Sequence, residues 1–451
     1  MGLEGEDLDR AKFVTSLAAD SVAPPNFLLG NPAALRRAFE TRGASLAAGL
    51  KNFIDDIRHN HGMPSQVDKS AFEVGRNLAT TPGAVVHRHE ILELIQYQPK
   101  TDTQHAQPLL IVPPQINKYY VYDISPDKSM VGYLLEQGFQ VYMVSWRNPT
   151  ADRRAWGLDD YILALDEAID VTRSISGADK VNMVGACAGG ITLATALAYL
   201  AGRSDLDKVA SLTLMVNVLQ PSAADSVLGL FTGDDAIEMA RKKSARAGVL
   251  DGSETARVFN WMRPNDLIWN YVVSNYLLGE TPPAFDILYW NNDTTRLPAR
   301  LHSDFLDVFK DNLLTKQGEL SINEVPIDLK KVNVPAFVTG GTTDHITPWQ
   351  ACYRTTQLLG GDVTYVLSTA GHIQSLINPP TNSKRKFYTN PENPPSAEAW
   401  TKTTEEHAGS WWPYWAEWLK GLHEGEIDSP NEFGNVEHPE IAPAPGTYVF
   451  E

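Results

Sequence analysis

The stretch VNMVGACAGGITLA at residues 181–194 predicts a buried strand, a tight turn and the first turns of a helix. Cys187 stands at the apex of the turn, between Gly185 and Gly189. A strand-turn-helix of this form holds a nucleophile in a strained backbone conformation, and small neighbours avoid clashes. The helix N-terminus favours a negative charge at the thiol, and the N–H of Ala188 is expected to face a developing oxyanion.

Strands and helices alternate on both sides of this turn. Residues 108–114, 140–146, 180–186 and 209–217 read as apolar strands, and residues 158–175 read as a helix with one apolar face. The pattern stops after residue 217 and resumes at 334–349 and 363–376. Apolar strands that alternate with helices indicate a parallel sheet covered on both faces.

We therefore expect an α/β-hydrolase fold, with a mainly parallel sheet covered by helices, a cap insertion and a helical N-terminal region. The expected parts are a helical region at 1–85, the first part of the core at 86–217, the cap at 218–328 and the second part of the core at 329–451. In the first part, Asn31 is the expected N-cap of a helix and Pro32 its first residue.

An acid and a histidine follow the two late strands. Asp344 comes after VPAFVTGG and His372 after VTYVLST, so nucleophile, acid and histidine occur in the order that this fold requires. We predict that Cys187, Asp344 and His372 form a catalytic triad; taken singly, Asp344 could be a turn residue and His372 a loop cap. His345 is expected to be structural. The backbone N–H of Ile116, in the loop PPQINKYY, is the candidate second oxyanion donor.

The composition of the chain limits the classes of partner that it can bind. The chain has a net charge of −17 and no block of Lys or Arg, which argues against nucleic acid. Its apolar runs are too short for a transmembrane segment, and its start has no secretory signal, so we expect a cytoplasmic protein. No residues occur at metal-ligand spacing, so neither a metal nor a cofactor is expected. Cys352, the second of two cysteines, is expected to be buried in a helix.

Six motifs resemble the polyhydroxyalkanoate (PHA) synthases: GACAGG, VPPQINKYYVYDISPDKS, VSWRNPT, FDILYWNNDTTRLP, GTTDHITPW and GHIQSLINPP. The resemblance runs from about Leu8 to the final APGTYVFE. It implies an acyltransferase that polymerises (R)-3-hydroxyacyl-CoA, with Cys187 as nucleophile, Asp344 as acid and His372 as histidine. It also implies no cofactor, because CoA is carried by the substrate and released. A growing polyester chain, a granule surface and a second copy of the chain are the partners that it implies.

Two positions resemble the class II members of that family, which prefer medium-chain substrates. Gln115 stands where class I members typically have tryptophan, and Ala186 stands where they have an aromatic residue. The chain begins inside the N-terminal region of the family, so a shortened N-terminus is expected. The leading segment that other members carry is associated with granule attachment.

The thiol suits acyl transfer, because exchange of one thioester for another keeps the acyl group reactive toward a hydroxyl. Residues expected beside the acyl chain are Asn217, Ala370 and Gln374. Candidate contacts for CoA phosphates are Arg147, Arg153, Arg154 and Arg296, and aromatic residues expected to keep water out are Trp261, Trp269, Tyr289 and Trp290. Either His372 or Asp344 could activate the substrate hydroxyl. Two other functions stay open: a cysteine thioesterase or esterase, and a non-catalytic polymer-binding relative.

Overall fold

The computed structural model describes residues 5–221, 233–423 and 425–451, and the chain folds into two compact units. One unit joins residues 1–73 to residues 253–293, and the other joins residues 74–252 to residues 294–451. The division differs from the boundaries expected at 85, 217 and 328, because the segment expected to be one cap is shared between the two units. Residues 222–232 of that segment lie outside the described residues.

The first unit is helical. Its longer elements are α1 (Gly5–Ser21), α2 (Pro32–Glu40), α3 (Ala44–His59), α9 (Gly252–Met262), the π-helical turns η7 (Asn265–Trp269) and η8 (Val272–Leu277), and α10 (Asp286–Asn291). The predicted helix N-cap is confirmed, since the Asn31 side chain accepts a hydrogen bond from the Ala34 N–H at 3.0 Å. Gly43, with φ of 87°, separates α2 from α3, so the helix that begins at Pro32 ends at Glu40 and a second helix follows it.

Hydrogen bonds join the two distant segments of this unit. The Asn52 side chain on α3 donates to the backbone carbonyls of Asn275 and Glu280, both at 3.0 Å. The buried Asp56 carboxylate accepts a hydrogen bond from the Tyr276 hydroxyl at 2.8 Å. A Cβ atom at Gly49 would lie 1.9 Å from the Tyr276 carbonyl oxygen, so only glycine permits this approach of the backbones.

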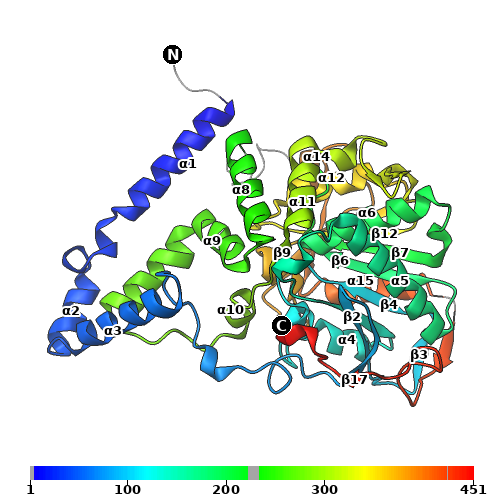
Figure 1. Cartoon of the computed structure of the whole chain (residues 1–451), viewed down its shortest axis with the longest axis horizontal. Helices are drawn as coiled ribbons and strands as arrows, with labels where there is room; N and C mark the ends of the chain where they lie inside the picture. The colour runs from blue at the N-terminus through cyan, green and yellow to red at the C-terminus, as the bar shows by residue number, and fades with distance from the viewer. Residues whose placement is uncertain (1–4, 222–232, 424) are drawn as a thin grey trace. The chain divides into compact units, whose positions relative to one another are not determined.

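The second unit is built on a central sheet with helices packed around it (Figure 1). The sheet has eleven strands in the order β15-β14-β13-β12-β7-β6-β4-β5-β2-β1-β17. The six strands from β13 to β5 are parallel to one another, and the strands at both edges are antiparallel. Their bounds are β1 (Gly83–Arg88), β2 (Leu92–Tyr97), β4 (Leu109–Val112), β5 (Val141–Trp146), β6 (Val181–Ala186), β7 (Val209–Met215), β12 (Ala336–Gly341), β13 (Val363–Ser368), β14 (Lys386–Thr389), β15 (Glu405–Ala408) and β17 (Ala442–Pro443).

Short antiparallel pairs lie outside this sheet: β3 (Thr103–His105) with β16 (Glu426–Asp428), β8 (Val249–Leu250) with β9 (Leu297–Pro298), and β10 (Ser321–Ile322) with β11 (Val325–Pro326). The helices of this unit are α4 (Met130–Glu136), α5 (Leu158–Ser176), α6 (Cys187–Gly202), α8 (Asp234–Ala247), α11 (Ala299–Asp311), α12 (Trp349–Leu358), α13 (His372–Leu376), α14 (Ala397–Thr401) and α15 (Trp412–Lys420).

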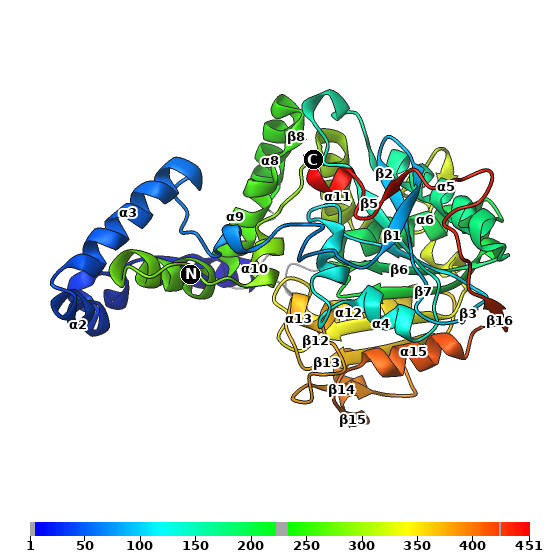
Figure 2. The same cartoon turned by 90° about the horizontal axis from the view of Figure 1, so that it is seen from below.

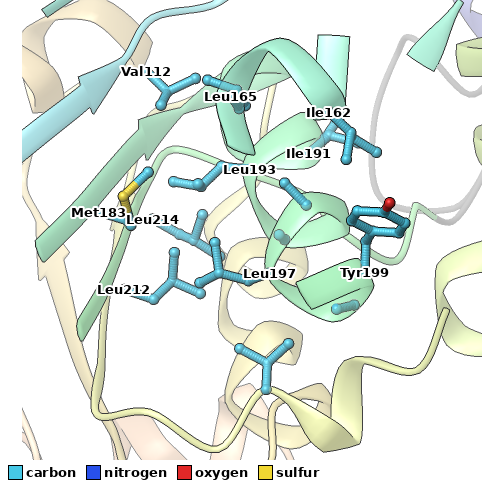
Figure 3. Close-up of a cluster of buried hydrophobic side chains, with 14 of the residues drawn as sticks. Val112, Ile162, Leu165, Met183, Ile191, Leu193, Leu197, Tyr199, Leu212 and Leu214 are labelled. Carbon is cyan, nitrogen blue, oxygen red and sulfur yellow. The ribbon is translucent and has the colours of Figure 1, made fainter. Parts of the chain in front are cut away.

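One face of the sheet packs against α5 and α6. Leu193 and Leu197 on α6 meet Leu212 and Leu214 on β7, and all four side chains are fully buried (Figure 3). Burial of one leucine side chain contributes about 1.5–3 kcal/mol, so this cluster holds the helix that begins at Cys187 firmly on the sheet.

The opposite face packs against α15. Thr213 lies between Leu212 and Leu214 and therefore points to the other side of β7. Its hydroxyl accepts a hydrogen bond from the Trp415 indole N–H at 3.0 Å. Both faces of β7 are thus covered, which explains why the sequence of the strand is almost wholly apolar.

The sheet order brings the predicted catalytic residues to one edge. Strands β13, β12, β7 and β6 are neighbours, as Figure 2 shows. Cys187 follows β6, Asp344 follows β12 and His372 follows β13, and the carboxyl ends of parallel strands share one edge. Among the described residues, no helix combines the length and the apolar content that crossing a membrane requires.

Candidate active site

Cys187 occupies the turn between β6 and α6 with a φ of 48°, in the left-handed region that side chains rarely adopt. Ala186, immediately before it, is extended, with φ of −128° and ψ of 149°. The chain therefore reverses sharply at the cysteine. The Cys187 thiol is half-buried, and the backbone conformation of the turn sets the direction in which it points.

The glycines around the turn are required by close contacts. A Cβ atom at Gly189 would lie 2.3 Å from the Pro113 carbonyl oxygen, at the end of β4. A Cβ atom at Gly185 would lie 2.9 Å from the Cα atom of Gly190. Because α6 begins at Cys187, the N–H groups of its first turn have no carbonyl partner within the helix. They are the kind of donor that an oxyanion needs.

His372 and Asp344 are hydrogen-bonded, with Nδ1 of the ring 2.7 Å from Oδ2 of the carboxylate. Both side chains are buried. The other carboxylate oxygen, Oδ1, accepts the backbone N–H groups of Ile346 and Thr347, both at 2.9 Å. These bonds fix the carboxylate from two directions, and the ring that it holds is fixed in turn.

The charges of the pair determine its pKa values. Burial by itself would lower the pKa of His372, but the Asp344 charge and hydrogen bond, together with the interaction with Cys187, raise it well above its ordinary value. Burial would likewise raise the pKa of Asp344, but His372 and Thr347 outweigh it and leave that pKa lowered. Since Asp344 binds Nδ1, the ring nitrogen left for the thiol is Nε2. The structure thus brings Cys187 next to the hydrogen-bonded pair of His372 and Asp344.

Thr347 belongs to the same network, and the sequence reasoning missed it. Its hydroxyl donates to Asp344 Oδ2 at 2.6 Å and lies 3.0 Å from His372 Nδ1. The signal was present in the sequence, because an aspartate that accepts the N–H groups two and three residues ahead forms a recognisable turn. The residue three positions after such an aspartate is placed beside its carboxylate.

Cys352, the second cysteine, lies on α12 and is fully buried, as the sequence predicted. Its thiol donates to the Thr347 carbonyl at 3.4 Å. Burial, followed by the charge of Asp344, raises the pKa of this thiol far above its ordinary value. A buried and protonated thiol is unreactive, so Cys352 supports the site by packing.

The loop after β4, which carries the proposed second oxyanion donor, is held from two sides. The Gln115 side chain donates to the Thr192 hydroxyl on α6 at 2.8 Å, and the Gln115 carbonyl accepts the Thr295 hydroxyl. The carbonyl of Ile116 accepts the Thr295 N–H at 3.1 Å. The loop is therefore rigid next to the nucleophile turn, while the use of the N–H groups of Ile116 and Ala188 as oxyanion donors stays a prediction.

Asn217 lies close to the nucleophile, as expected, but its side chain contacts the backbone of the nucleophile turn. It is fully buried, and its side-chain amide donates to the Cys187 carbonyl at 2.7 Å. A Cβ atom at Gly190 would lie 2.8 Å from the same amide nitrogen. Asn217 therefore supports the turn, which is a positioning role, and its contact with an acyl chain stays a prediction.

The other two pocket candidates also have partners of their own. Ala370 is buried, and its carbonyl accepts the Thr343 N–H at 3.1 Å, so it braces the loop that carries Asp344. Gln374 is exposed and accepts a hydrogen bond from Arg385 at 3.1 Å. Gln374 therefore differs from the expectation, because α13 turns its side chain toward the surface of the unit.

The arginines suggested for CoA phosphates have protein partners. Arg147 pairs with Glu451 at 3.1 Å and Arg153 with Glu90 at 3.3 Å. Arg154 donates to the Ala245 carbonyl, and Arg296 donates to Asn148. The four aromatic residues expected to exclude water, at positions 261, 269, 289 and 290, belong to the unit of residues 1–73 and 253–293. Both roles stay predictions.

Comparisons with protein families agree with this geometry. Residues 1–134 match the family described as the poly-beta-hydroxybutyrate polymerase (PhaC) N-terminus. Residues 108–379 match the alpha/beta hydrolase fold, which confirms the fold expected from the sequence. The second match contains the nucleophile turn, Asp344 and His372.

Curated relatives extend the similarity to almost the whole chain. Poly(3-hydroxyalkanoate) polymerase 2 of Ectopseudomonas oleovorans is 52% identical over 449 residues, which are 99% of this chain and 80% of that protein. Polymerase 1 of the same organism is 51% identical over 450 residues, or 100% of this chain and 80% of the relative. The poly(3-hydroxyalkanoate) polymerase subunit PhaC of Cupriavidus necator is 44% identical over 98% of this chain and 75% of its own length.

Proposed function

This chain belongs to the poly(3-hydroxyalkanoate) polymerase family, and we propose on that premise how its residues carry out the reaction. It is an acyltransferase that polymerises (R)-3-hydroxyacyl-CoA into polyester with release of CoA. The acyl group is carried as a thioester on Cys187. The observation that supports this assignment most is the position of Cys187, on its strained turn, next to the hydrogen-bonded pair of His372 and Asp344 at one edge of the sheet.

Acylation begins when His372 accepts the thiol proton of Cys187, for which its raised pKa suits it. The sulfur attacks the thioester carbonyl, a new bond from Cys187 sulfur to carbon forms, and the bond to CoA sulfur breaks. The proton held by His372 goes to the departing CoA. Asp344 keeps the imidazole oriented and stabilises its charged form.

In elongation, the acyl group leaves Cys187 and is transferred to a hydroxyl group. The 3-hydroxyl of a second acyl group attacks the thioester on Cys187, its proton passes to the enzyme, and the sulfur regains a proton as it leaves. Between the two candidate bases, the contacts favour His372. Asp344 uses both oxygens to accept hydrogen bonds and has a lowered pKa, so it is a poor proton acceptor.

No cofactor is needed for either step, because CoA arrives with the substrate. A preference for medium-chain acyl groups is supported by Ala186, which leaves room beside Cys187, and by Gln115 in the loop after β4. Water must be kept from the acyl-enzyme, and the segment 218–328 is proposed to contribute to that cover.

We propose that the enzyme works in the cytoplasm, at the surface of the polyester granule. Helices α1 to α3 and the turns between them expose large apolar side chains, which suit contact with an apolar polymer. These are Leu8, Val14, Val22, Phe27, Leu29, Leu35, Phe39, Leu50, Phe53, Ile54 and Ile57. A homodimer is a further proposal and rests on the family resemblance.

The test follows CoA release and product from (R)-3-hydroxydecanoyl-CoA with the wild type, Cys187→Ala and Cys187→Ser. We expect CoA and insoluble polyester from the wild type and neither from Cys187→Ala. Cys187→Ser keeps the turn but forms an ester, and should be acylated without efficient elongation. Free 3-hydroxy acid in an amount equal to CoA would identify a thioesterase, and polymer binding without acylation of Cys187 would identify a non-catalytic relative.

A further inference from the structure

Two buried side chains, Asn217 and Thr295, each hold one backbone carbonyl near the nucleophile. The Asn217 amide donates to the Cys187 carbonyl at 2.7 Å. The Thr295 hydroxyl donates to the Gln115 carbonyl in the loop after β4. Asn217 is fully buried and Thr295 is only 3% exposed, so each of these bonds is shielded from water and fixes the orientation of one peptide group.

The peptide groups that they hold are the ones that carry the two predicted oxyanion donors. The Cys187 carbonyl and the Ala188 N–H belong to one peptide group, and the Gln115 carbonyl and the Ile116 N–H belong to the other. Both peptide groups are trans. A trans peptide group is planar, so its carbonyl and its N–H point in opposite directions. A side chain that holds the carbonyl therefore sets the direction of the N–H.

The same bonds make each N–H a stronger donor. A carbonyl that accepts a hydrogen bond draws electron density from the N–H of its own peptide group. Hydrogen bonds in such a chain strengthen one another by about 10–30% per bond in condensed phase. On each side of the acyl group, the side chain, the peptide group and the developing oxyanion would form one chain of this kind.

The backbone before Asn217 is strained in a way that fits this role. Val216 has a φ of 44°, in the left-handed region that a β-branched residue rarely adopts. Its N–H donates to the Thr339 carbonyl on β12 at 2.9 Å, which holds the residue in place just after β7. Strain of this kind persists where the surrounding structure imposes it, and here it precedes the residue that holds the nucleophile turn.

Thr295 is fixed by the loop that it holds. Its N–H donates to the Ile116 carbonyl at 3.1 Å. Further along the loop's contacts, the Gln115 side chain donates to the Thr192 hydroxyl at 2.8 Å, and this hydroxyl donates to the Ala188 carbonyl at 3.3 Å. Side chains thus join the two donor-carrying segments to each other, and the distance between the two N–H groups is set before substrate arrives.

We propose that Asn217 and Thr295 are positioning residues for the oxyanion of the reaction. Asn217 directs the Ala188 N–H at the acyl oxygen on Cys187, and Thr295 directs the N–H of Ile116 at the same oxygen. The inference rests on the proposed function. Neither residue exchanges a proton: the bond from sulfur to carbon forms, the bond to CoA sulfur breaks, and the thiol proton reaches CoA through the catalytic histidine. The two residues therefore affect only steps that pass through an oxyanion.

The test compares two reactions of Cys187. Acylation by (R)-3-hydroxydecanoyl-CoA passes through an oxyanion, whereas alkylation by iodoacetamide is a direct displacement and does not. Cys352 is fully buried, so intact mass reports both reactions at Cys187. In Thr295→Val and in Asn217→Leu, we expect single-turnover acylation to slow about 10- to 100-fold, less than loss of an oxyanion donor itself would cause, with alkylation at the wild-type rate.

Thr195→Val is the matched control for Thr295→Val. The Thr195 hydroxyl is also fully buried, but it donates to the Ile191 carbonyl within its own helix at 2.8 Å. Both reactions should therefore keep their wild-type rates in Thr195→Val. Thr295→Ser keeps the hydroxyl group and should restore most of the acylation rate.

Acylation at the wild-type rate in Thr295→Val or in Asn217→Leu would overturn the role of that residue. Alkylation slowed as much as acylation would place the effect on the thiol or on the fold and overturn the proposal. An equal loss in Thr195→Val would make it a general effect of removing a buried hydroxyl. A wild type that is alkylated at Cys187 but never acylated would instead refute the proposed function, and this inference with it.

Discussion

Thr347 joins the acid to the histidine through one hydroxyl group. Thr347→Val keeps the shape of the side chain and removes that hydroxyl, so Asp344 loses one of its hydrogen bonds. A hydrogen bond to a charged group contributes about 1.5–3 kcal/mol, and kcat should fall by roughly 10- to 100-fold. Steady-state CoA release measures the effect.

Thr347→Ser is the matched control, because it keeps the hydroxyl and removes only a methyl group. We expect it to recover most of the activity lost in Thr347→Val. Equal activity of wild type and Thr347→Val would show that the backbone N–H groups of Ile346 and Thr347 hold Asp344 sufficiently by themselves.

The pair of Asp344 and His372 gives stability within a defined pH window. Asp344 has a lowered pKa when folded, so its contribution is present above its ordinary value of 3.8 and is lost as pH falls below it. His372 has a raised pKa, so its contribution is present below its ordinary value of 6.5 and is lost as pH rises through the raised value.

The difference in unfolding free energy between wild type and Asp344→Asn should therefore be largest between pH 3.8 and 6.5 and should shrink on both sides. Urea unfolding at a series of pH values measures it. A difference that stays constant with pH would contradict the ion pair.

At the scale of single residues, the sequence predicted that Cys187, Asp344 and His372 come together, because each one stands at or shortly after the end of an apolar strand of the sheet. It did not predict the contacts that Thr347 and Asn217 make. Asn217 was placed near the nucleophile correctly, but only the structure shows that its amide holds the Cys187 carbonyl.

The start of α6 is an element whose position depends on Gly189. In Gly189→Ala the new Cβ atom would meet the Pro113 carbonyl at 2.3 Å, so β4 and α6 must move apart. Such crowding costs about 1–3 kcal/mol or more, and it displaces Cys187 from the other catalytic groups. We expect a loss of stability in denaturant unfolding and loss of acylation by acyl-CoA.

Gly421, at the end of α15, provides the control. Its φ is −64°, and the nearest atom to a new Cβ would be the Trp418 carbonyl oxygen at 3.4 Å, an ordinary contact. Gly421→Ala should leave the activity unchanged and stabilise the protein by about 0.4–1 kcal/mol. Normal acylation by Gly189→Ala would show that the turn tolerates a wider separation from β4.

Among the elements, the parallel strands were predicted well, since each is a continuous apolar run. The antiparallel strands β14 and β15 were not, because they are short and partly exposed: KFYT and EEHA carry no clear alternation. The break between α2 and α3 was also missed. There Gly43 adopts a φ of 87°, and the surrounding residues keep the helical spacing of apolar positions on both sides.

In the α/β unit as a whole, Glu93 links an early strand to the last residues of the chain. Its fully buried carboxylate pairs with Arg88 at 2.6 Å and accepts the N–H groups of Thr447 at 2.9 Å and Tyr448 at 3.0 Å. Glu93→Ala leaves these donors without a partner and should destabilise the unit by about 3–5 kcal/mol in denaturant unfolding.

Glu90→Ala is the comparison, because Glu90 is 63% exposed and pairs with Arg153 at the surface. Its removal should change the unfolding free energy by no more than about 0.5 kcal/mol. Similar losses in the two variants would mean that the buried network around Glu93 contributes no more than a surface pair.

The division into two units was not predictable from local patterns. The bond from Asn52 to Asn275 joins residues 223 positions apart, and the polar side chains on either side give no sign of it. Composition separates apolar from polar segments, but it does not tell which of several helical segments will pair. For this reason the segment 218–328 was expected to be a single insertion.

The same division has a consequence on the ribosome. Helix α3 is synthesised early, yet its hydrogen-bonding partners at residues 275 to 280 emerge only after most of the parallel sheet has been made. At about 5–20 residues per second, the nascent helix waits roughly 10 to 50 s without these partners. During translation, this interval is when the chain has greatest need of a chaperone.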